Sequence, residues 1–229
     1  GTQPPAPENG EPWEKEDIEV PEPLDFQVTV TATRNAVSVD EIGFSTHVIG
    51  REEIQAQGAY TLAQVLESVP GFNVARSGSF GGPTSVFVRG GESDFNLVMV
   101  DGVQINQPGG SLDFANFSTT NVERIEIVRG PGSVLYGSGA VTSIIHIITA
   151  QGRDGPEAEL RGEGGTFNSY RASGWVSGGT EVLGYSLSGL YSETDGCLPF
   201  NSGYERSELS ARFDFQPRAG TNVTATVRH

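Results

Sequence analysis

The sequence has little cysteine and histidine and no long apolar run, and each absence excludes a class of protein. A single cysteine, Cys197, leaves no internal disulfide and no cysteine-based metal site in 229 residues. The histidines His47, His146 and His229 are far apart and lack the spacing of a zinc-binding motif. No apolar run reaches about 18 residues, the length expected of a membrane-spanning helix. A helical membrane protein is therefore excluded, and a β-barrel stays open.

Positive charge is also scarce. Lysine and arginine total 14 against 29 acidic residues, and the net charge of -15 argues against binding nucleic-acid phosphate. The only lysine, Lys15, lies far before the glycine-rich stretch 130–139, so that stretch is not a phosphate-binding loop of the Gly-Lys-Ser/Thr type. No ordered Ser/His/Asp or Cys/His set indicates an enzyme. The first residues lack a secretory signal, so the protein is not exported or its signal has been removed.

The N-terminal region changes character near residue 25. Residues 1–24 combine proline with acidic side chains and few apolar ones, a composition that predicts a disordered leader. In the following "LDFQVTVTATR", residues 24–34, β-forming side chains alternate with polar ones, which predicts an extended strand. Such a strand pairs either with the sheet edge of a partner protein or with a sheet of its own domain.

A mixed domain is predicted from Ser38 to Ala150. A short helix over 50–58 ends at Gly58, and Thr61 and Gln64 have the spacing of a capping box before a second helix. Pro70 and Gly71 end this helix, and its apolar face consists of Leu62, Val65, Leu66 and Val69. Short strands are predicted at 84–91, 96–106, 122–130 and 142–150, each bounded by glycine, proline or asparagine turns.

Five alternating segments follow Gly155. They cover 158–165, 169–178, 185–195, 207–216 and 222–229, with apolar side chains such as Leu187, Phe213 and Val227 on one face. Glu163, Arg171, Ser186 and Arg212 are on the other. Alternation over about 9 to 11 residues is typical of strands in an outer-membrane β-barrel. A soluble antiparallel sheet with one wet face gives the same pattern, but aromatic residues near the strand ends and the long connection 195–206 favour the barrel.

The chain resembles a TonB-dependent outer-membrane receptor over about residues 25–229. The matching motifs occur in the family's order: "DFQVTVTA", "LAQVLESVPGFNV", "VFVRGG", "VMVDGVQIN", "VERIEIVRGPGSVLYGSGA" and "IIHIIT". The string 122–140 is the most specific of these, and among subfamilies the chain is most similar to the cobalamin receptors. The pattern departs from the family at Thr142 and Ser143, where a glycine pair is usual, and at His146, where asparagine is usual.

The resemblance implies a fold and a domain division. It implies an α+β plug domain followed by antiparallel transmembrane β-barrel strands, with a leader at 1–24, a TonB-box-like segment at 25–34, a plug at 35–152 and strands at 153–229. Glycines in a plug permit the close turns that a barrel interior requires. Five strands cannot close a barrel, since bacterial single-chain barrels begin at about 8 strands. We therefore expect the N-terminal part of a receptor, either truncated or completed by a second polypeptide.

The resemblance also implies partners and site residues. TonB, driven by an inner-membrane proton-powered complex, would pair with the box through its C-terminal domain. The box residues are Asp25, Phe26, Gln27, Val28, Thr29, Val30, Thr31 and Ala32. The plug apices would bind cobalamin or a ferric siderophore through Ser79, Phe80, Asp94, Phe95, Asn106, Gln107 and Phe114. Arg89, Glu126 and Arg129 would hold the plug against the barrel wall.

The expected location is the bacterial outer membrane, with lipid around the strands and the plug and N-terminus facing the periplasm. No cofactor is expected. Glu193 and Asp195 could hold a structural calcium ion, because carboxylate oxygens suit that ion, but a solvated loop is the favoured interpretation. The alternative function is a soluble or surface β-rich ligand-binding or adhesin module without transport activity.

Overall fold

The computed structural model describes residues 29–30, 37–38, 45–106, 110–130, 139–152, 155–218 and 221–229. The predicted leader 1–24 lies outside the described residues. Of the predicted TonB box, only Thr29 and Val30 are described. They form the strand β1 (Thr29–Val30), which pairs antiparallel with β2 (Val37–Ser38). Among the described residues, no helix is long and apolar enough to cross a membrane.

The plug, by which we mean the described residues from 45 to 152, is built on a mixed sheet. Its strands are β3 (Ser45–Gly50), β6 (Asn96–Val100), β7 (Val103–Gln104), β8 (Val122–Arg129) and β9 (Ser143–Thr149). They lie in the order β3-β8-β9-β6-β7, and only β6 and β9 run parallel. One face packs in the core with the helices through Ile125 and Ile127 of β8 and Ile145 and Ile147 of β9. Leu97, Met99, Val128 and Ile144 cluster on the other face.

One predicted strand is divided in two. The sequence predicts a single strand over 96–106, but the chain reverses at Asp101 and Gly102, so that Val100 pairs with Val103. Both turn residues have positive φ, +50° and +83°. An Asp-Gly pair in this conformation is a favoured two-residue hairpin turn, since its twist matches that of the flanking strands.

Two short helices cover the plug sheet. The helix α1 is Arg51–Ala56, and α2 is Leu62–Glu67. The predicted capping box is present, because the Gln64 backbone N–H donates to Thr61 Oγ1 and Thr61 N–H donates to Gln64 Oε1. The apolar face predicted for α2 is buried in the core, as expected. Beside α2 lie β4 (Phe72–Arg76) and β5 (Thr84–Val88), which form a two-stranded sheet, and the short 3-10 helix η3 (Phe114–Asn116). A second 3-10 helix, η2 (Ser93–Phe95), contacts β5.

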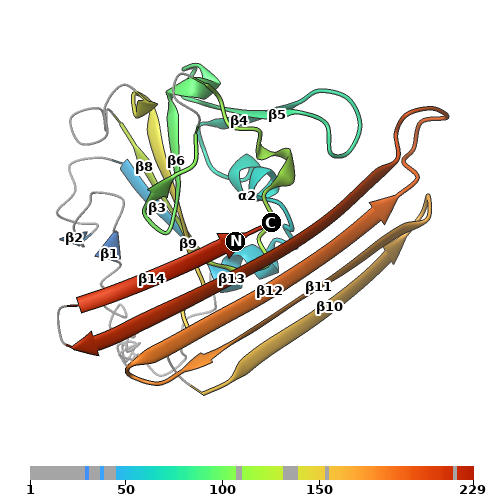
Figure 1. Cartoon of the computed structure of the whole chain (residues 1–229). Helices are drawn as coiled ribbons and strands as arrows, with labels where there is room; N and C mark the ends of the chain where they lie inside the picture. The colour runs from blue at the N-terminus through green and yellow to red at the C-terminus, as the bar shows by residue number, and fades with distance from the viewer. Residues whose placement is uncertain are drawn as a thin grey trace, which may run out of the picture.

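A second sheet follows the plug and runs alongside it (Figure 1). Its strands β10 (Glu157–Gly165), β11 (Ser169–Gly179), β12 (Leu183–Thr194), β13 (Tyr204–Arg218) and β14 (Thr221–Arg228) are antiparallel and in sequence order. The predicted alternation is confirmed, since apolar side chains such as Leu160 and Leu209 are exposed while Ser186 and Arg212 are buried. The fold class is therefore as predicted, with β10 and β14 at the edges of an open sheet.

Candidate ligand cavity and plug–sheet interface

A cavity of about 370 Å³ lies at one end of the second sheet. This loop end carries the connections 166–168 and 195–203, and the opposite, turn end carries the connection 180–182. The plug contributes Tyr60, Ser79 and Phe80 to the cavity. The strands and their loops contribute the rest of its lining, including Glu163, Phe167, Tyr170, Arg171, Glu193 and Cys197. Aromatic rings, charged groups and hydroxyls in one concave site suit a ligand that has both apolar and polar surface.

Phe80 is held in place by a chain of aromatic rings. Its ring centroid lies 6.1 Å from that of Tyr60 and 5.1 Å from that of Tyr204, with the second pair edge to face. The next residue, Gly81, has φ of +81°, and a Cβ there would lie 2.1 Å from the Tyr204 ring. Only glycine therefore lets the loop between β4 and β5 approach β13 this closely.

The predicted ligand residues are only partly brought together. Ser79 and Phe80 line the cavity, whereas Asp94 and Phe95 lie in η2, beyond the opposite end of β5. The Asn106 side chain is engaged within the plug, where it accepts from Val98 N–H at 2.6 Å and donates to the Asn96 carbonyl.

Phe114 corrects the prediction. Its ring is fully buried in the hydrophobic core, where an aromatic side chain contributes most to packing, so it is not placed to touch a ligand. Gln107 lies outside the described residues.

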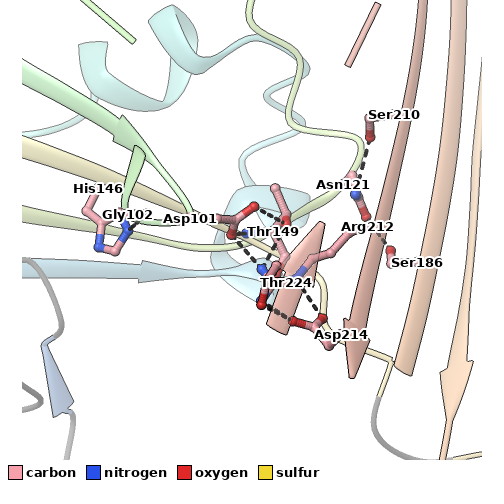
Figure 2. A network of polar contacts seen from close by, with 10 residues as sticks. All are labelled: Asp101, Gly102, Asn121, His146, Thr149, Ser186, Ser210, Arg212, Asp214 and Thr224. Carbon is pink, nitrogen blue, oxygen red and sulfur yellow. Dashed lines mark hydrogen bonds and ion pairs between the residues drawn. The ribbon is translucent and has the colours of Figure 1, made fainter. Parts of the chain in front are cut away.

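The plug is anchored to β13 by a buried ion pair (Figure 2). Arg212 Nη1 lies 2.6 Å from Asp101 Oδ1, and the two side chains are 5% and 7% exposed. The same nitrogen donates to Thr149 Oγ1, while Nε and Nη2 donate to the two carboxylate oxygens of Asp214. Asp101 in turn accepts from the Thr149 N–H and hydroxyl. A guanidinium group as buried as that of Arg212 requires such a set of partners, because the desolvation of an unpaired ion is costly.

A second buried contact joins the plug to two strands at once. Asn121 precedes β8, and its side-chain oxygen accepts from the Ser186 hydroxyl of β12 at 2.9 Å (Figure 2). Its side-chain nitrogen donates to Ser210 Oγ of β13 at 3.3 Å. The asparagine therefore ties both strands to the start of β8. We name the Asp101, Thr149, Asn121, Ser186, Ser210 and Arg212 contacts the anchor.

The predicted wall-contact residues occupy other places. Arg89 is exposed, with φ of +52°. Glu126 is fully buried in the plug sheet, where its carboxylate meets Arg124 at 2.9 Å and His146 Nδ1 at 3.6 Å. Arg129 Nη1 donates to the Pro70 carbonyl at 2.7 Å, and its buried Nε has no hydrogen-bond partner among the described residues. Their contact with a barrel wall stays a prediction.

Sequence reasoning missed the anchor itself. The alternating pattern places Ser186 and Arg212 on the polar face of the strands, but it does not identify their partners on the plug. Asp101 had been placed inside a strand, where its carboxylate had no assigned role. The Asp-Gly pair was the available signal, because this pair favours a hairpin turn that projects the aspartate.

The acidic loop residues proposed for calcium have other partners. Asp195 Oδ2 accepts from the Asn168 side chain at 2.6 Å, and Glu193 Oε2 accepts from the Tyr191 hydroxyl at 2.8 Å. Within the described ranges, no three His, Cys, Asp or Glu side chains gather as a metal would require.

The chain was compared with known proteins. Residues 38–144 match the TonB-dependent Receptor Plug Domain. The vitamin B12 transporter BtuB of Vibrio vulnificus is 36% identical over 215 residues, which cover 88% of this chain and 34% of that protein. This chain thus spans about a third of the length of the curated relatives that it matches.

Solved structures show the same fold. The ferric yersiniabactin uptake receptor FyuA of Yersinia pestis is 25% identical, with a TM-score of 0.62 over 76% of this chain and 29% of that chain. The pyoverdine outer membrane receptor FpvA of Pseudomonas aeruginosa is 18% identical, with a TM-score of 0.74 over 87% of this chain and 29% of that chain.

Proposed function

Because this chain carries the plug domain of the TonB-dependent receptors, we propose that it is the N-terminal part of an outer-membrane receptor for a scarce nutrient. The receptor binds cobalamin or a ferric siderophore and imports it with energy transduced by TonB. Cobalamin is the first choice, since the 36% identical relative is a vitamin B12 transporter. Solutes of this size do not pass small pores and must be captured tightly, which requires a concave site.

The loop-end cavity is the observation that carries this function. Plug and strands build it jointly, with Ser79 and Phe80 from one and Arg171 and Glu193 from the other. A ligand that contacts both the plug and the strands binds most tightly at one relative position of the two. Binding at this cavity is therefore coupled to the position of the plug. This shared construction suits a receptor whose plug must respond to ligand.

The proposed orientation places the loop end outside the cell. The connections 166–168 and 195–203 then face the medium, while the short connection 180–182 and the N-terminus face the periplasm. Long outer loops and short periplasmic turns are the usual arrangement in outer-membrane barrels. The exposed apolar side chains of β10 to β14, which include Leu160, Leu209 and Phe213, then face lipid.

TonB is the proposed source of energy, because the outer membrane has no nucleotide supply of its own. Its C-terminal domain pairs with residues 25–32 through main-chain hydrogen bonds, as in other cases of strand addition. Thr29 and Val30 pair with β2 here, so this pairing must open before TonB can bind.

Uptake measurements test the proposal. The full natural polypeptide that contains this chain is expressed in a strain without its own cobalamin receptor, and accumulation of radiolabelled cyanocobalamin or ferric siderophores is measured. We expect uptake that Val28→Pro abolishes, because proline removes a backbone N–H from the paired strand. Val28→Ile, which retains the N–H, should preserve uptake. Failure of a peptide of residues 22–34 to bind the TonB C-terminal domain, together with unchanged uptake by Val28→Pro, would refute the TonB-box assignment.

The alternative is a β-rich ligand-binding or adhesin module without transport. It predicts that the product partitions into water without detergent and that surface binding occurs without accumulation inside the cell. The exposed apolar face of the second sheet argues against this alternative, because large apolar patches on a water-soluble protein are rare.

A further inference from the structure

Three hydrogen bonds hold the Asp-Gly turn between β6 and β7 against the strand β9. The Asp101 N–H donates to the Ile147 carbonyl at 2.9 Å, and the Asp101 carboxylate accepts from the Thr149 N–H at 3.0 Å. The Gly102 N–H donates to Nε2 of His146 at 2.9 Å, and Figure 2 shows this bond beside the anchor. One of the groups that fix the turn is therefore an imidazole, whose hydrogen-bonding capacity changes with pH.

The bond from Gly102 fixes the protonation of the His146 ring. A backbone N–H can only donate, so Nε2 must accept and carries no proton. The neutral ring then carries its proton on Nδ1, which lies 3.6 Å from Oε2 of Glu126. A second proton would have to enter at Nε2, where it would face the Gly102 N–H, donor against donor. The charged ring therefore cannot keep this bond in the observed geometry.

Four charged side chains of the described residues lie around His146. On β8, Glu126 pairs with His146 across the strands, and Arg124 binds the same Glu126. Asp101 of the turn and Arg212 of β13 line the same cavity as His146, which measures about 670 Å³ and has no other charged lining side chain. The residue of β6 that pairs with His146 is an apolar methionine. Carboxylates ordinarily titrate near pH 4, whereas imidazoles take up a proton between about pH 5 and 8.

The surroundings of the ring decide where the cost of its protonation falls. His146 is 5% exposed, so its Nε2 and the Gly102 N–H depend mainly on each other for a hydrogen bond. An imidazolium here would have the Glu126 carboxylate beside Nδ1 as the partner of its charge. Its Nε2 proton would meet only another donor, and the adjoining cavity gives the turn room to move away. Protonation is therefore opposed chiefly by the Gly102 bond.

We propose that His146 is a pH-sensitive latch on the anchor: its neutral ring closes the turn at Gly102, and protonation of the ring releases the turn. Release frees the residue next to Asp101, whose carboxylate holds Arg212 of β13. The closed turn binds one proton fewer than the released turn, so a falling pH favours release. The inference goes beyond the proposed transport function and needs no ligand.

The latch depends on a residue by which this chain departs from its family. Asparagine, which is usual at position 146, does not titrate, so a receptor with asparagine there lacks the latch. The plug histidine His47 is not part of it. His47 pairs with Ile127, which packs on the opposite face of the plug sheet from His146. His47 is therefore a matched control for any general effect of removing a histidine.

Hydrogen exchange at two pH values tests the latch. The full natural polypeptide in outer-membrane vesicles is compared at about pH 7.5 and about pH 5.5, and each rate is divided by the intrinsic rate at that pH. We expect the protection of the peptide 98–106 to fall about 10-fold at the lower pH, because a buried donor loses its acceptor. The peptide 204–216 of β13 should keep its protection, since its amides pair with β12 and β14.

His146→Gln separates the imidazole from the neighbouring carboxylates. Glutamine places an uncharged amide oxygen near the position of Nε2, so it can accept from Gly102 at either pH. We expect equal protection of the peptide 98–106 at both pH values in this variant, and in His47→Gln the same fall as in the unmodified receptor. An equal fall in His146→Gln would assign the effect to a carboxylate and overturn the proposal. Unchanged protection in the unmodified receptor would also overturn it.

A second measurement reads the ring directly. With ¹⁵N-labelled histidine, the difference between the NMR spectra of the unmodified receptor and of His146→Gln isolates the two ring nitrogens of His146. We expect an unprotonated Nε2 at about pH 7.5 and a protonated one at about pH 5.5. A proton on Nε2 at the higher pH, or none at the lower pH, would refute the latch.

Discussion

Replacing Asp101 by asparagine should loosen the plug from the second sheet. Asparagine has the same shape and tolerates the positive φ of this turn, so the substitution removes the charge without straining the backbone. Arg212 then lies in a dry site with Asp214 as its remaining carboxylate. The perturbation therefore isolates the electrostatic part of the anchor.

The expected magnitude follows from burial. Removing one partner of a buried ion pair costs about 3 to 5 kcal/mol, and the lower end applies because Asp214 still compensates Arg212. At about 1.4 kcal/mol for each factor of ten, a loss of 3 kcal/mol raises the population of the released state roughly 100-fold. The effect should be local to β6, β7, β9 and β13, the elements that meet at Asp101 and Thr149.

Hydrogen exchange on the full natural polypeptide in outer-membrane vesicles is the assay. Peptides covering 98–106 and 143–150 should exchange faster in Asp101→Asn, while those covering α2 should not. Asp113→Asn is the matched control, since Asp113 caps η3 within the plug and accepts from Thr84 and Ala115. Equal exchange in the two variants would show that the Asp101 charge does not hold the plug.

Three further substitutions have defined expectations. Thr61→Ala removes the capping box and should destabilise α2 by about 1 kcal/mol, measured by exchange of its amides. Gly81→Ala should weaken cyanocobalamin binding at the cell surface because its Cβ would overlap the Tyr204 ring. Gly78→Ala should not, because Gly78 has a similar φ, +85° against +81°, but open space around its Cβ position. Gly184→Ala should reduce the heat-modifiable receptor in the outer membrane, because its Cβ would lie 2.1 Å from a plug carbonyl oxygen.

The sequence predicted those elements whose side-chain pattern is local. The capping box at Thr61, the buried face of α2 and the five alternating strands each depend on residues a few positions apart, and all are present. Alternation also identified the side of β11, β12 and β13 that faces the plug, because the polar residues of these strands are the less exposed ones.

Contacts between distant segments could not be read in this way. The Asp101–Arg212 pair spans 111 positions, and the Asn121–Ser210 pair spans 89. Phe114 was assigned to a ligand surface by resemblance to the plug apices of the family, yet the loop folds it into the core beside α2. Burial of a single aromatic side chain in a polar loop depends on where the loop packs. The residues next to it in the sequence do not determine that position.

The polar contacts between the plug and the second sheet are unevenly distributed. Here the buried polar contacts between the plug and the second sheet gather at β12 and β13, whereas β11 meets the plug through cation–π contacts of Arg171 with Tyr60 and of Trp175 with Arg51. If TonB pulls on the N-terminal side, as proposed, the force reaches α1 before the anchor, because α1 follows directly from the edge strand β3. The order of rupture is therefore set by topology and burial together.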